Sequence, residues 1–273
     1  MKRILLLLSF AAISITMPAQ VFEWTKGLIG SNTPLFNKVD NAGNVITINR
    51  FPGAGTFDVD PGPGIFNLTA NYANDHYLLK LNAQGNFMWA QKTADTYTSS
   101  LIHTYQSLTT DNSGNIYYAF QFFQVGGSVV IDIDPSPATF TVGAFAVGAS
   151  TVCIYIVKLD NAGNFIHATP AARNPLKDNL KTDATGNLFY TAVNQSTIAV
   201  DADPGPSTFT VEGSYIAKLD AAGNYTWVKP IGGLNPGLTS INESQDLFID
   251  KNNNIYVAGS YSGTPDFDPG IGT

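Results

Sequence analysis

Short apolar runs recur along the chain between polar turns, and no segment between them shows the spacing of an amphipathic helix. Asn115–Phe120 and Cys153–Val157, for example, are rich in β-branched and aromatic residues, which is typical of short strands. Ile116–Phe120 and Ile255–Ala258 are apolar at consecutive positions. A sheet with one face in water would alternate, so these runs predict strands that are covered on both faces.

The turns between the runs share the pattern Asp-x-x-Gly-Asn. Copies begin at Asp40, Asp111, Asp160, Asp183 and Asp220, and variants begin at Asn82 and Asp250. The first side chain can accept a backbone N–H bond from two residues on. The fourth position suits a residue in the left-handed region, for which Gly is best and Asn next. Each copy therefore predicts a hairpin turn.

The turns form two interleaved series with a period near 70 residues. Copies at Asp40, Asp111, Asp183 and Asp250 are 71, 72 and 67 residues apart, and the others follow Lys-Leu at Lys80, Lys158 and Lys218. Each period thus holds two hairpins, or four strands, without a helix. This is typical of the blades of a β-propeller, and we prefer that fold to a β-sandwich or a β-solenoid.

We therefore predict an all-β fold, a β-propeller of four-stranded blades with about 3.5 blades in the sequence. The expected boundaries are a closing strand at 20–30, blades at about 35–94, 105–170 and 178–232, and a partial blade at 246–273. The expectation is a piece of a larger propeller with exposed strand edges. The alternative is a compact ring of four blades in which the last blade lacks one strand.

The N-terminus predicts export. Lys2 and Arg3 precede an apolar run from Ile4 to Met17, and small residues follow, which is typical of a signal peptide covering residues 1–19. A buried core helix is the alternative interpretation. No later run is long enough to span a membrane. We expect a secreted or cell-surface protein without an intramolecular disulfide, because Cys153 is its one cysteine.

Composition excludes several classes of protein. Only 13% of residues are charged and 12% are aromatic, which argues against a coiled coil and against a disordered acidic tail. The formal net charge is −7, so we expect no nucleic-acid partner, because such partners bind basic surfaces.

Each period also contains an Asp-x-Asp-Pro element between its second and third strands, and we expect these elements to emerge on one rim. The aspartates are Asp58 and Asp60, Asp132 and Asp134, Asp201 and Asp203, and Asp266 and Asp268. Aspartates two apart on an extended chain point the same way and could bind Ca²⁺, which takes six to eight oxygen ligands. The alternative is a tight turn capped by Asp and fixed by Pro.

The chain resembles the SBBP-type bacterial β-propeller repeat proteins. The resemblance lies in residues 253–259, in Asp-Phe-Asp-Pro-Gly at 266–270 and in residues 218–227, which run from Lys-Leu-Asp to Trp227. It implies a propeller and export, and it is weak evidence for function. The chain departs from the pattern at His167, where the repeat usually has Trp.

No catalytic constellation stands out. His76, His103 and His167 have no metal-ligand spacing, and a Gly-x-Ser-x-Gly elbow is absent. We therefore expect a non-catalytic, exported scaffold that binds an unknown glycan or protein. The alternative is a carbohydrate-active hydrolase or lyase, which requires the aspartates at positions 58, 132, 201 and 266 to gather around one pocket.

Overall fold

The computed structural model contains strands and turns, and no helix in the residues that it describes. These are residues 23–28, 35–73, 75–94, 102–124, 130–134, 136, 138–143, 151–171, 175–194, 200–203, 208–211, 213–231 and 243–260. The predicted signal peptide lies outside them. Nothing in the described ranges is a helix able to cross a membrane.

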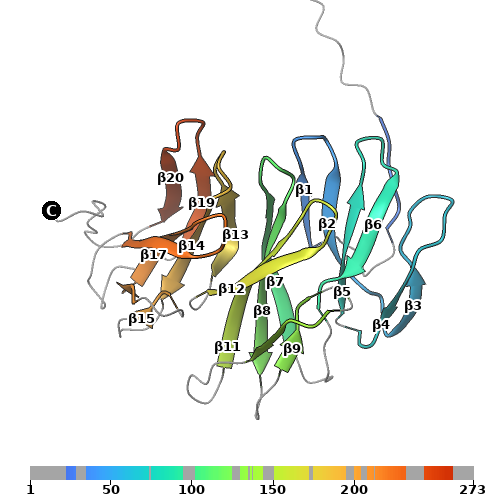
Figure 1. Ribbon diagram of the computed structural model, residues 1–273, viewed down its shortest axis with the longest axis horizontal. Coiled ribbons are helices and arrows are strands. Elements are labelled where there is room, and N and C mark those ends of the chain that lie inside the picture. The colour runs from blue at the N-terminus through green and yellow to red at the C-terminus, as the bar shows by residue number, and fades with distance from the viewer. Residues whose placement is uncertain are drawn as a thin grey trace, which may run out of the picture.

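The strands form repeated antiparallel sheets (Figure 1). The first sheet has the order β1 (Phe36–Val39), β2 (Val45–Arg50), β5 (His76–Leu81) and β6 (Phe87–Lys92). The second contains β7 (Ile102–Thr110), β8 (Ile116–Gln124), β11 (Thr151–Leu159) and β12 (Phe165–Ala171) in the same topology. The third contains β13 (Pro175–Thr182), β14 (Leu188–Asn194), β17 (Gly213–Leu219) and β18 (Tyr225–Pro230), and β19 (Glu243–Ile249) pairs with β20 (Ile255–Ser260).

The prediction of an all-β fold with four-stranded, propeller-type blades is confirmed. Apolar residues at consecutive positions are explained by packing on both faces of each sheet. Tyr118 lies in a buried cluster with Leu78 of the first sheet, and its neighbour Tyr117 lies in another cluster with Tyr190 of the third. Ile216 of the third sheet is in turn clustered with Leu247 of β19.

In the described residues, three Asp-x-Asp-Pro elements form small hairpins between the second and third strands of their sheets. The described hairpins are β3 (Gly55–Asp58) with β4 (Asn67–Ala70), β9 (Val130–Asp132) with β10 (Thr141–Gly143), and β15 (Val200–Asp201) with β16 (Thr210–Val211). In Figure 1 they lie toward the lower edge, away from the turns at the upper edge. They are more than rim loops, because Ile131 and Ile133 are fully buried between the first and second sheets.

The structure has no strand at residues 23–28, the described part of the closing strand predicted at 20–30. Trp24 instead docks through its side chain. Its indole N–H donates to the Ala83 carbonyl at 2.9 Å, and its ring lies against Gly85. The resemblance of this segment to β6 therefore reflects the same tryptophan contact without the backbone pairing.

Candidate interaction surface

The Asp-x-x-Gly-Asn turns form one edge of the molecule, which we call the turn edge. Oδ1 of Asp40 accepts the backbone N–H groups of Ala42 and Asn44, and its Oδ2 accepts the Asn44 side-chain amide. The first residue of every described copy accepts the same two backbone bonds. The fourth residue has φ between 63° and 91° in all of them. The predicted turns are therefore confirmed in detail.

The turns also connect neighbouring sheets. The backbone carbonyl at the second position of a β5–β6-type turn accepts hydrogen bonds from the preceding sheet. Trp89 donates to Asn161 at 3.3 Å, and Lys158 donates to Ala221 at 2.7 Å. The turn edge is thus a hydrogen-bonded surface that runs across successive sheets, which suits it to present groups in fixed positions.

A buried lysine, Lys80, forms an ion pair with the first residue of a turn on the turn edge. The Lys80 ammonium lies 3.1 Å from Asp40 Oδ2, and the side chains are 0% and 3% exposed. Burial opposes ionisation of Asp40, but hydrogen bonds from Asn44 and the charge of Lys80 outweigh it and lower the pKa of Asp40. The pair was not predicted from the sequence, although Lys80, Lys158 and Lys218 each stand in an otherwise apolar third strand, which was a signal for it.

His167 occupies the position that Trp89 takes in the first sheet, and it leaves a polar atom unsatisfied. Its Nε2 is buried and has no hydrogen-bond partner in the described part of the chain. Desolvation, helped by the positive charge of Lys158, lowers the pKa of His167, although the Ala221 backbone and the Asp220 carboxylate act in the opposite direction. The folded protein therefore favours the neutral imidazole.

We expect His167 to make the protein less stable as pH falls. Because its folded pKa is below its unfolded value near 6.5, its contribution to stability is present above pH 6.5 and is lost as pH falls through that value toward the folded pKa. Tm of the wild type measured from pH 7.5 to 5 should fall more steeply than Tm of His167→Gln. Parallel curves would contradict this assignment.

The paired aspartates lie in three separate hairpins in the described residues. Oδ1 of Asp132 accepts the N–H groups of Asp134 and Phe140, and Asp58 and Asp201 make the equivalent bonds to their own loops. Asp60 and Asp134 accept N–H bonds from residues two further on, at positions 62 and 136. Asp203 is buried, and Asp266 and Asp268 lie outside the described residues. The observed hydrogen bonds are those of capped turns.

Asp132→Ala should destabilise the protein in the presence of a chelator. The change leaves two backbone N–H groups without their acceptor, which typically costs about 1–3 kcal/mol per group when the site is buried. Urea unfolding measures the loss. Asp134→Ala is the matched control, with a smaller effect, because one N–H bond to this carboxylate is recorded, from Ser136. Equal losses would show that the turn cap is not the reason.

One pocket opens on the turn edge between the first and second sheets. It has a volume of about 580 Å³ and is lined by Met88, Trp89, Asn115, Asp160, Asn161 and Ala162. We call it the turn-edge pocket. Met88, which is 44% exposed, and Asp160 line the same pocket. Hydrogen bonds from Asn164 and the backbone outweigh the slight burial of Asp160 and lower its pKa, so the pocket carries a negative charge at neutral pH.

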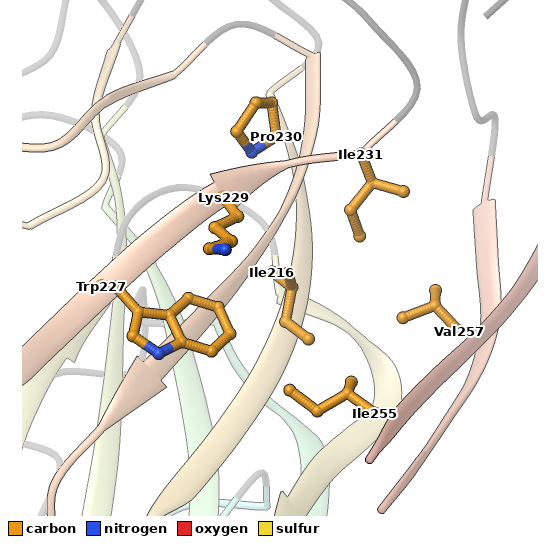
Figure 2. Close-up of a pocket in the computed structure, with 7 residues that line it drawn as sticks. All are labelled: Ile216, Trp227, Lys229, Pro230, Ile231, Ile255 and Val257. Atoms are coloured by element: carbon orange, nitrogen blue, oxygen red, sulfur yellow. The ribbon is translucent and has the colours of Figure 1, made fainter. Parts of the chain in front are cut away.

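A second pocket lies between the third sheet and β20, and we call it the inter-sheet pocket. Its volume is about 610 Å³, and it is lined by Ile216, Trp227, Lys229, Pro230, Ile231, Ile255 and Val257. Figure 2 shows Ile216 and Ile255 facing one another across this space. The walls are mostly apolar. Neither pocket contains a group of three or more metal-ligating side chains, and the described ranges as a whole contain none.

The comparison with known proteins supports a propeller-type repeat. The chain is 25% identical over 216 residues to an uncharacterized WD repeat-containing protein of Acanthamoeba polyphaga mimivirus. The match covers 71% of this chain and 15% of the viral protein, so the chain spans a small part of that relative. No protein-family model matches the chain. The repeated four-stranded sheets and this distant similarity together indicate a β-propeller-like repeat protein.

Proposed function

We propose that the protein is a non-catalytic interaction scaffold that binds a segment of a protein partner in the turn-edge pocket. The pocket carries the proposal because it joins an exposed apolar side chain to an ionised carboxylate. Met88 is flexible and polarisable, which suits an adaptable contact. Trp89 offers an aromatic surface that is held by its bond to Asn161. A partner with an apolar side chain next to Lys or Arg fits this chemistry.

Hydrogen bonds that fix the residues around the turn-edge pocket support the same function. The pocket lies where Trp89 of β6 is hydrogen-bonded to the Asn161 turn of the second sheet, so little ordering accompanies binding. The aspartates of the described insertions remain in separate hairpins, each bonded to its own loop. A carbohydrate-active enzyme would need them around one pocket, so the geometry favours the scaffold over that alternative.

The place of action is also part of the proposal. The basic start and apolar run of residues 1–19 support export, and the repeat motifs support an SBBP-type exported propeller. Calcium binding by the Asp-x-Asp-Pro turns stays a prediction. It would appear as a rise in Tm with millimolar Ca²⁺ relative to chelator, partly lost in Asp201→Asn with Asp203→Asn.

A peptide array and a glycan array on the purified protein test the function. We expect peptides with adjacent apolar and basic residues to bind, with affinity that falls as salt rises. Met88→Asp should abolish binding, whereas Ile65→Asp, at an exposed residue of the first insertion, should leave it intact. Glycan binding alone, or equal losses in both variants, would overturn the proposal. Turnover of a glycoside that an Asp→Ala change abolishes would establish the enzyme instead.

A further inference from the structure

The described seams between sheets are filled by an insertion hairpin from the later sheet. Between the first and second sheets, Ile131, Ile133 and Val142 are buried in the same cluster as Leu78 and Tyr118. Between the second and third sheets, Ala202 and Val211 share a cluster with Ile156 and Tyr190. The insertion is therefore a regular part of the core between successive sheets.

The seam between the third sheet and β20 differs in its burial. Ile255 and Val257 are only partly buried there. Their equivalents in the second sheet, Ile116 and Tyr118, are both 0% exposed, and those in the third, Leu188 and Tyr190, are 2% and 0% exposed. The inter-sheet pocket lies against this underfilled part of β20.

We propose that the inter-sheet pocket is the docking site of the fourth Asp-x-Asp-Pro copy, in residues 266–270, with the Phe267 side chain entering it. Phe267 has the position of Val59, Ile133 and Ala202, which are all buried. Asp266 follows Ile255 by 11 residues. The equivalent distances in the other repeats are 13, 16 and 13, so the connection has a similar reach.

The chemistry of the pocket matches this segment. An aromatic side chain buries more apolar surface than the aliphatic residues at the equivalent positions, and Trp227 provides a ring against which it can pack. Lys229 lines the pocket and lies over the Trp227 ring, with its Nζ 5.7 Å from the centroid. The aspartates on either side of Phe267 complement this positive charge.

Fluorine NMR of the full chain labelled with 5-fluorotryptophan tests the proposal, because the chain has three tryptophans and each gives one resonance. Phe267→Leu removes the ring, and Phe267→Ala removes most of the side chain. We expect both to shift the Trp227 resonance and leave those of Trp24 and Trp89 in place. Phe267→Ala should also increase the broadening of the Trp227 resonance by a soluble paramagnetic agent by about twofold or more, because the side chain becomes more exposed to solvent.

Ile133→Ala is the matched control, because it truncates the equivalent side chain in another seam. It should lower Tm without moving the Trp227 resonance. If Phe267→Ala fails to fold, Phe267→Leu still decides the matter. An unchanged Trp227 resonance in folded Phe267→Leu, or an equal shift in Ile133→Ala, would overturn the docking site. Neither result depends on a ligand of the turn-edge pocket.

Discussion

Asp40→Ala is expected to lower the free energy of unfolding by about 3–5 kcal/mol, the loss typical of breaking a buried ion pair from one side. The reason is that Lys80 Nζ, 3.1 Å from Asp40 in a side chain with no exposure, would keep a buried charge without its counter-ion. Its contacts with the Asn161 carbonyl and side chain are to uncharged groups and do not replace the carboxylate. Urea unfolding at pH 7 measures the loss.

Asp160→Ala separates the ion pair from the turn. Asp160 accepts the same two backbone N–H bonds and the same amide bond as Asp40, and its carboxylate is exposed, with no ion pair recorded in the described residues. Asp160→Ala should therefore lower the free energy of unfolding by only about 1 kcal/mol. Lys80→Met is the complementary variant, because it removes the charge instead of stranding it and should destabilise less than Asp40→Ala. Equal losses at both aspartates would show that the ion pair contributes nothing.

The strands and turns of this protein were predictable because their signals are local. An Asp-x-x-Gly-Asn copy contains both its acceptor and its left-handed residue within five positions, so the hairpin follows without knowledge of the rest of the fold. The two-sided burial of Ile116–Phe120 was also visible as an apolar run that does not alternate. These features led directly to the four-stranded sheets.

Contacts between sheets were harder to predict from the sequence, because they join residues about 70 positions apart. Trp89 reaches Asn161 across 72 residues, and Lys80 reaches the same residue across 81. Trp24 shows the limit of pattern matching, since its tryptophan contact is repeated while the predicted strand around it is not seen. The turn-edge pocket exists only where side chains from two sheets meet, so single motifs could not predict it.

Gly223→Ala should be the most disruptive single-methyl change in the turns. Gly223 has φ of 88°, a region that costs an L-residue about 1–2 kcal/mol. An added Cβ would also lie 2.4 Å from His167 Cε1 and 2.4 Å from Thr169 Oγ1. Thr169 donates to the Gly223 carbonyl at 3.0 Å, so it has little room to move. Overpacking of this kind adds about 1–3 kcal/mol, for a total of roughly 2–5 kcal/mol.

Gly186→Ala isolates the backbone contribution to that loss. Gly186 has a similar φ of 82°, but the nearest atom to an added Cβ, Asp111 Oδ2, is 3.6 Å away, an ordinary contact. Gly186→Ala should therefore lower the free energy of unfolding by only about 1–2 kcal/mol. Gly186→Asn should lose less still, because Asn253 adopts φ of 63° at the same turn position. If urea unfolding gave equal losses for Gly223→Ala and Gly186→Ala, the second and third sheets would not be in close contact at this turn.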